Sequence, residues 1–184
     1  MTSKGGWFHA SKITLPKHSK TLSHSFCTLH VFRTAFRVPL NVPKCLLKYG
    51  AESLIHVPRN DQLTCLHISC HKGHVSIVKE LLRCADNDLL LARMKHGHGC
   101  LHLACEQNHL DVVKLLLTST GENTLSLLRM VARDGSTCLH VACHRGHVNI
   151  AKELLQLVDH DLLSARAKEG YSCLYLACHA TSTL

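Results

Sequence analysis

Aromatic residues are scarce in this chain: phenylalanine, tryptophan and tyrosine together make up 4% of its 184 residues. Because apolar residues in total reach 46%, a hydrophobic core has to be built from leucine, valine, isoleucine, alanine and cysteine. No stretch reaches the run of about 18 apolar residues that a membrane-spanning helix requires. The N-terminus also lacks the continuous apolar segment of a secretory signal. We therefore expect a single intracellular, cytoplasmic domain whose cysteine thiols are reduced.

Motifs that would indicate catalysis are missing as well. The sequence contains no Gly-rich phosphate loop, no paired carboxylates and no nucleophile elbow. Cysteine and histidine are adjacent at 70–71, 143–144 and 178–179, but neighbours in sequence do not face each other on a helix. We expect no enzymatic activity, no cofactor and no small-molecule substrate.

Charge is distributed unevenly along the chain, although the formal net charge is +8. Residues 1–59 hold nine Lys/Arg and one acidic residue, whereas residues 60–184 hold twelve of each sign. The excess positive charge therefore lies in the N-terminal part, and net charge gives no reason to expect nucleic-acid binding by the remainder.

A sequence pattern recurs along the second part of the chain. TCLHISCHKGHVSIVKELL begins at Thr64, GCLHLACEQNHLDVVKLLL at Gly99, TCLHVACHRGHVNIAKELL at Thr137 and SCLYLACHA at Ser172. The starting positions are separated by 35, 38 and 35 residues. Such a period is typical of a repeat architecture in which each unit is one supersecondary element.

Each copy predicts two short helices. Thr64, Gly99, Thr137 and Ser172 are all residue types that can cap a helix N-terminus. Left-handed turns at Gly73, Asn108 and Gly146 should end the first helix of each copy. In the second helix of the first copy, Val75, Val78 and Leu82 form an apolar stripe, with Ile77 and Leu81 beside it. Gly97, Gly135 and Gly170 indicate a turn before the next cap.

These motifs resemble the ankyrin-repeat family, whose signature is Thr-Pro-Leu-His-x-Ala, then Gly-His, then a Val/Ile-rich helix ending in Leu-Leu. The resemblance implies an all-α solenoid of helix-turn-helix units joined by hairpin-like loops. Cysteine stands where the family usually has proline, and extra length follows each second helix. We expect a basic Ser/Thr-rich leader at 1–43 and a degenerate half-repeat at 44–59. A repeat follows at 60–94, a repeat with a longer connector at 95–132, a third repeat at 133–167 and a truncated repeat at 168–184.

The many cysteines and histidines raise the question of a zinc site. Eight of the cysteines fall in two repeat columns: Cys65, Cys100, Cys138 and Cys173, then Cys70, Cys105, Cys143 and Cys178. Equivalent positions in stacked helices lie about 8–10 Å apart, beyond the reach of a disulfide. Within one copy the two cysteines point to different helix faces. We expect these thiols to pack as small apolar groups and to bind no metal, with redox sensing as the lesser alternative.

A repeat solenoid exposes one long surface, and the family's usual work is to hold another protein. The resemblance implies contacts from hairpin tips and from the exposed face of the first helices. The tip residues are Lys95, His96, His98, Arg133, Asp134, Lys168 and Glu169. The first-helix residues are His71, Lys72, Glu106, Gln107, His144 and Arg145. Since basic side chains flank Glu106 along the first helices, we expect a partner with some acidic residues.

Three further expectations concern the ends of the chain. The last copy stops near the end of its first helix, which favours a fragment of a larger protein and marginal stability. That protein could be a membrane protein or an enzyme that the repeats regulate. Residues 1–40 hold ten Ser/Thr, six Lys/Arg and no acid, so the leader is a poorly ordered remnant, a targeting segment, or a tether to nucleic acid or an anionic membrane.

Overall fold

The computed structural model of the chain describes residues 55–181. The leader and most of the predicted half-repeat lie outside these residues. Helices dominate the described part, where extended pairing is confined to one isolated bridge between Arg166 and Ser172. Within residues 55–181, no helix combines the length and apolar character needed to cross a bilayer.

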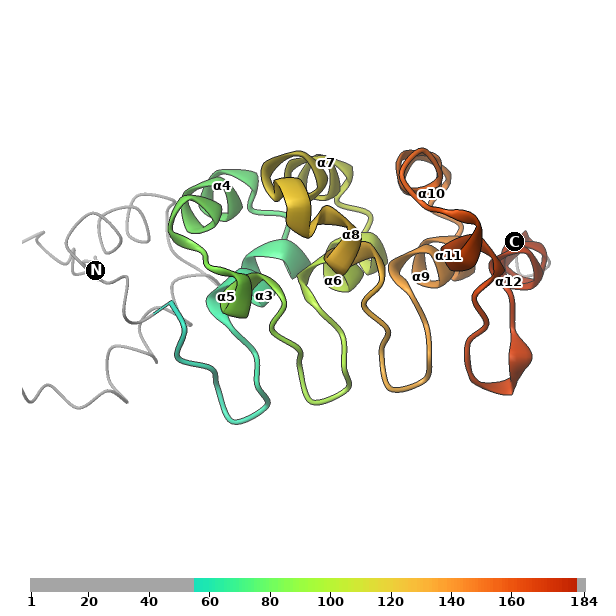
Figure 1. Cartoon of the computed structure of the whole chain (residues 1–184), viewed down its shortest axis with the longest axis horizontal. Coiled ribbons are helices and arrows are strands. Elements are labelled where there is room, and N and C mark those ends of the chain that lie inside the picture. Colours follow the sequence, from blue (N-terminus) through green and yellow to red (C-terminus); the bar gives the residue numbers. More distant parts are fainter. Residues whose placement is uncertain (1–54, 182–184) are drawn as a thin grey trace, which may run out of the picture.

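The helices stack in two layers, as predicted for a solenoid (Figure 1). The first helices of the four copies form one layer: α3 (Cys65–His71), α6 (Cys100–Glu106), α9 (Cys138–His144) and α12 (Cys173–Thr181). The second helices form the other layer: α4 (Val75–Cys84), α7 (Leu110–Ser119) and α10 (Val148–Leu155). Neighbouring first helices pack against each other, as do neighbouring second helices, and in the first three copies the first helix also packs against the second. The core is therefore continuous along the stack.

The predicted caps begin the first helices. His67 donates its backbone N–H to Thr64 Oγ1 at 3.4 Å, and the Thr64 N–H donates back to His67 Nδ1 at 3.3 Å. Thr137 and His140 make the same reciprocal pair. At Gly99, which has no hydroxyl, only the bond from its N–H to the histidine ring remains. The Leu-His histidine thus completes a capping box that usually uses Glu or Gln.

The predicted left-handed turns end the first helices. Gly73, Asn108 and Gly146 have φ values of 71°, 60° and 69°. Asparagine replaces glycine in the middle repeat because it tolerates this conformation better than other side chains do. The turn reverses the chain within three residues, so that α4, α7 and α10 begin beside the helices that precede them.

The apolar stripe of the second helices differs from the prediction. In α4 the buried residues are Ile77, Val78 and Leu81, whereas Val75 is exposed and Leu82 is half buried. Val75 is the first residue of the helix, and the buried face is centred on Ile77, Val78 and Leu81 rather than on the predicted stripe. The same positions are buried in α7, at Val112, Val113 and Leu116.

Each connector carries a further short helix that the sequence analysis did not predict. They are α5 (Asn87–Leu90), the 3-10 turn η2 (Gly121–Asn123) with α8 (Thr124–Leu128), and α11 (His160–Ser164). Asp86 and Asp159 cap α5 and α11, each accepting a backbone N–H at 2.9 Å. The signal was present in the sequence as DNDLL and DHDLL, a capping aspartate followed by two leucines.

Hairpin-like loops project from one side of the stack (Figure 1). Consecutive hairpins are joined by backbone hydrogen bonds from Lys95 N–H to Asp61 O at 3.1 Å, Arg133 N–H to His96 O at 3.0 Å, and Lys168 N–H to Asp134 O at 2.7 Å. Glycine permits this close approach, because a Cβ at Gly97 would lie 2.9 Å from the Arg133 nitrogen. The last hairpin includes the 3-10 turn η3 (Lys168–Gly170).

Candidate protein-binding surface

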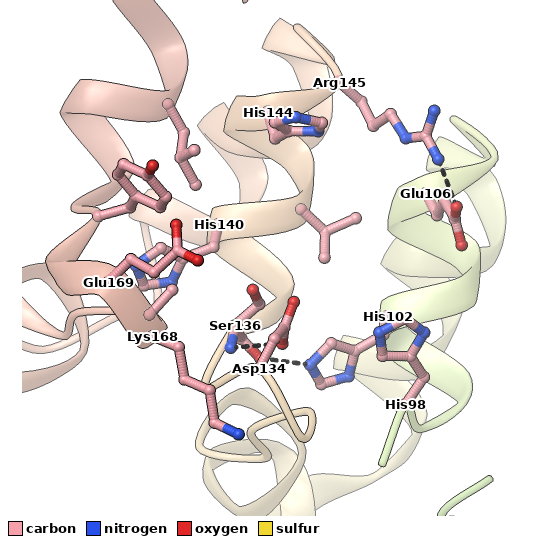
Figure 2. Close-up of a pocket in the computed structure, with 14 residues that line it drawn as sticks. His98, His102, Glu106, Asp134, Ser136, His140, His144, Arg145, Lys168 and Glu169 are labelled. Atoms are coloured by element: carbon pink, nitrogen blue, oxygen red, sulfur yellow. Dashed lines mark hydrogen bonds and ion pairs between the residues drawn. The ribbon is translucent and has the colours of Figure 1, made fainter. Parts of the chain in front are cut away.

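A groove of about 410 Å³ lies between the hairpins and the first helices (Figure 2). Its walls come from the last two hairpins and from α6, α9 and α12. We call it the recognition groove, and its lining is His98, His102, Glu106, Asp134, Ser136, His140, Val141, His144, Arg145, Ala167, Lys168, Glu169, Tyr171 and Leu176. The groove therefore combines charged rims with a few apolar and imidazole groups, as a peptide-binding surface requires.

The structure brings about half of the expected contact residues together in this groove. Those are His98, Glu106, Asp134, His144, Arg145, Lys168 and Glu169. The remaining ones lie outside it, on the hairpins and at the C-terminal ends of α3 and α6: His71, Lys72, Lys95, His96, Gln107 and Arg133. Seven lining residues were not among the expected contacts: His102, Ser136, His140, Val141, Ala167, Tyr171 and Leu176. Tyr171 could have been found, because it directly follows the hairpin glycine Gly170 in a chain that has few aromatic residues.

Three cations occupy the same register at successive hairpin tips. Lys95, Arg133 and Lys168 each stand four residues before a helix cap, and all three side chains are exposed. Their backbone N–H groups make the hydrogen bonds that join consecutive hairpins, so the register is built into the backbone. We call these three residues the cation row. Equivalent positions in stacked repeats are about 8–10 Å apart, so the cation row extends roughly 20 Å.

An ion pair links the first helices of the second and third repeats. Arg145 at the end of α9 donates to the carboxylate of Glu106 at the end of α6 (Figure 2). Both side chains are partly exposed, so the pair contributes little to the free energy of unfolding, at most about 1 kcal/mol. Its main effect is on charge: the acidic centre expected along the first helices is neutralised by its own neighbour.

Asp134 remains anionic beside the cation row. Partial burial raises its pKa, but hydrogen bonds from Ser136 outweigh this, and the pKa of Asp134 falls below its usual range. The backbone N–H of Ser136 lies 2.9 Å from Asp134 Oδ1. His98 stacks on His102 at the groove edge, with ring centroids 5.7 Å apart. The hairpin is thus held by its own side chains before any partner binds.

Buried imidazoles form the floor behind the hairpins. His67 and His102 are almost fully buried, and burial lowers the pKa of each to about 4. Their Nε2–H groups donate to the carbonyls of Ala92 and Ser136 at 3.1 and 3.2 Å. These histidines are therefore neutral and structural.

His140 differs from its two counterparts. It is buried, and burial lowers its pKa, but its Nε2 has no hydrogen-bond partner among the described residues. The carbonyls of Tyr171 and Ala165 only partly offset the effect of burial on its pKa. The capping interaction is unchanged, since Thr137 Oγ1 lies 2.9 Å from His140 Nδ1. The last hairpin thus fits its neighbour less closely than the earlier hairpins do.

The histidines that follow the left-handed turn residues form hydrogen bonds between adjacent repeats. The Nε2–H of His109 donates to the His71 carbonyl at 3.1 Å, and that of His147 donates to the Glu106 carbonyl at 3.2 Å. Each acceptor is at the C-terminal end of the preceding first helix, where carbonyl groups lack helical partners. These imidazoles therefore join each of these first helices to the turn of the next repeat.

The cysteines of the two columns interact between adjacent repeats. The expected spacing of about 8–10 Å applies within one column, and the interacting thiols belong to different columns. The pairs in hydrogen-bond contact are Cys70 with Cys100, Cys105 with Cys138, and Cys143 with Cys173. Six cysteines are buried as predicted, but Cys143 is half buried and Cys178 is exposed. Among residues 55–181, no three Cys, His, Asp or Glu side chains gather closely enough to hold a metal.

Comparison with known families identifies the architecture. A model of ankyrin repeats in three copies matches residues 38–126, and a second ankyrin-repeat model matches residues 101–155. The chain belongs to the ankyrin-repeat family. Ankyrin repeats generally serve protein–protein interaction and are typically non-catalytic. A search of curated proteins finds no match to the chain.

Proposed function

We propose that this chain is a non-catalytic adaptor that binds an extended, acidic segment of another protein along the hairpin tips and the recognition groove. The cation row carries this proposal. Three exposed cations stand in one register along the hairpin tips, with the exposed acids Asp134 and Glu169 beside the second and third, on a chain segment whose overall charges balance. Electrostatic complementarity of this kind selects partners and accelerates their association.

The spacing of the row favours an extended peptide. Neighbouring cations are about 8–10 Å apart. A peptide in the extended polyproline II conformation advances about 3.1 Å per residue with three residues per turn. Acidic side chains at every third position of such a peptide would therefore share one face and meet Lys95, Arg133 and Lys168 in turn.

The groove beside the last two tips accommodates the rest of the partner. Val141 and Leu176 give it apolar contact area, and Tyr171 adds an exposed aromatic ring. Aromatic side chains often supply much of the binding free energy at protein interfaces. Because the Arg145–Glu106 pair satisfies its own charges, it contributes shape to the groove wall more than attraction.

The test uses the whole chain and synthetic peptides of about ten residues. One peptide has Glu at every third position, and its control has the same composition with the Glu residues clustered. Fluorescence polarisation at several salt concentrations should show tighter binding of the spaced peptide, weakening as salt rises. Reversing Arg133 to Glu should weaken binding about tenfold.

A matched control is Lys152→Glu on α10, which makes the same charge change at an exposed residue of the outer layer. It should leave affinity unchanged. Equal affinity for both peptides, or an equal loss of affinity with Arg133→Glu and Lys152→Glu, would show that only net charge matters. Either result would contradict a role for the cation row. The double change Glu106→Arg with Arg145→Glu should retain binding, since it preserves the ion pair in reverse.

A further inference from the structure

Two thiols from adjacent repeats meet near the C-terminal end of the described stack. Cys143 lies near the end of α9 and Cys173 begins α12, and these two helices pack side by side (Figure 1). Both cysteines line one cleft of about 770 Å³. The Cys173 thiol donates a hydrogen bond to the Cys143 sulfur. A disulfide would require the two sulfur atoms to approach to about 2.05 Å.

The same contact occurs twice in the interior, which provides an internal reference. Cys70 meets Cys100, and Cys105 meets Cys138, in the equivalent register. All four of these side chains are at most 1% exposed. The third pair differs because Cys143 is only half buried and faces an open cleft. Within residues 55–181, only this pair among the three therefore offers a sulfur to a dissolved oxidant.

The two members of the pair are not equivalent. The hydrogen bond from Cys173 lowers the pKa of Cys143, although burial opposes this. The same hydrogen bond and burial raise the pKa of Cys173 far above its usual range. Negative charge on the pair consequently resides on the more exposed sulfur, and a thiolate is the reactive form of cysteine.

We propose that Cys143 and Cys173 form a peroxide-responsive thiol pair that closes to a disulfide between the third and fourth repeats. The Cys143 thiolate attacks hydrogen peroxide, the O–O bond breaks, and Cys143 becomes a sulfenic acid while hydroxide leaves and is protonated to water. The Cys173 sulfur then attacks the Cys143 sulfur, the S–O bond breaks, and a second water departs. Two thiols are oxidised to one disulfide, and one peroxide is reduced to two waters.

Closure would tie α12 to α9 covalently. The segment around α12 supplies Tyr171 and Leu176 to the recognition groove, so one wall of the groove would become fixed. The disulfide does not depend on which partner the groove binds, because both thiols lie in the cleft between α10 and α12, whereas the hairpins line the recognition groove.

The decisive experiment treats the full-length, native protein with hydrogen peroxide, blocks the remaining thiols and maps the digest by mass spectrometry. The peptide joining Cys143 to Cys173 should form at least about tenfold faster than peptides joining Cys70 to Cys100. Equal rates for the two pairs would overturn the proposal. So would a Cys143 linked mainly to the exposed Cys178.

A variant separates the two chemical steps. In Cys173→Ser, the sulfenic acid at Cys143 should persist and be captured by dimedone. Cys105→Ser is the matched control in a buried pair and should leave the link between Cys143 and Cys173 unchanged. A folded Cys173→Ser protein without a dimedone adduct at Cys143 would contradict the mechanism. If either variant fails to fold, the rates measured on the unaltered chain still decide.

Discussion

The imidazole of His109 donates from Nε2 to the backbone carbonyl oxygen of His71 at 3.1 Å, joining the end of one repeat's first helix to the turn of the next. Replacing His109 with alanine would leave that partly buried carbonyl without its partner. We expect a loss of about 1–2 kcal/mol in the free energy of unfolding, measured by urea denaturation. The control is His96→Ala at an exposed hairpin tip, which should change stability by less than about 0.5 kcal/mol. Equal effects of the two substitutions would show that the inter-repeat bond is unimportant.

Two turn glycines provide a matched pair. Gly73 and Gly146 have similar φ values, 71° and 69°, but a Cβ at Gly73 would lie 2.5 Å from the His109 ring, whereas none of the described atoms lies within 4 Å at Gly146. Gly146→Ala should cost only the backbone strain of about 1–2 kcal/mol. Gly73→Ala should cost more, since the hydrogen-bonded His109 must also move. Thermal and urea unfolding of both variants would measure the difference, and a smaller loss for Gly73→Ala would contradict the steric argument.

Stability should fall steeply on mild acidification. Burial lowers the pKa of His67 and of His102 to about 4, below the ordinary value of 6.5 that each regains on unfolding. Between these values the unfolded chain binds more protons, so stability is present at neutral pH and is lost as pH falls from about 6.5 towards 4. Each histidine should contribute roughly 2 kcal/mol of loss by pH 5.

Urea denaturation of the chain at pH 7 and pH 5 would measure this dependence. His102→Gln should reduce the loss between the two pH values, even if it destabilises the protein at pH 7. An unchanged pH dependence in His102→Gln would show that this buried histidine is not the titrating group.

Equivalent leucines in the third and fourth repeats should respond differently to truncation. Leu139 is 2% exposed, whereas Leu174, at the same repeat position, is 74% exposed. Leu139→Ala should cost about 2–5 kcal/mol because it leaves a cavity in the core. Leu174→Ala should cost less than about 0.5 kcal/mol. Comparable losses would show that Leu174 is covered in solution.

The sequence predicted most of the helical framework because that framework depends on local rules. Thr64 and Thr137 begin helices, Gly73 and Asn108 end them, and these outcomes need only nearby backbone groups. The connector helices were missed although Asp86 marks one of them. Propensity reasoning had treated the extra length after each second helix as a loop.

Contacts between repeats were harder to predict, because they depend on how far one helix is rotated against the next. The meeting of Cys143 with Cys173 joins two different repeat columns, and no periodicity within a single column indicates it. The pairing of Arg145 with Glu106 is similar: each was expected to face a partner, and the stacking brings them to each other. Charges at the tips were predicted individually. Their common register was already visible in the sequence, as a position four residues before each helix cap, and the hairpin hydrogen bonds show it in the backbone.

The hairpins touch through single backbone hydrogen bonds, such as that from Arg133 to His96, while the helices behind them are held by a continuous core. Such a stack can change its curvature, because the helical layers stay packed while the spacing between the hairpin tips changes. The distance between neighbouring cations would then vary with curvature. A partner whose acidic groups are slightly too close or too far apart could still bind, at the free-energy cost of changing the curvature of the stack.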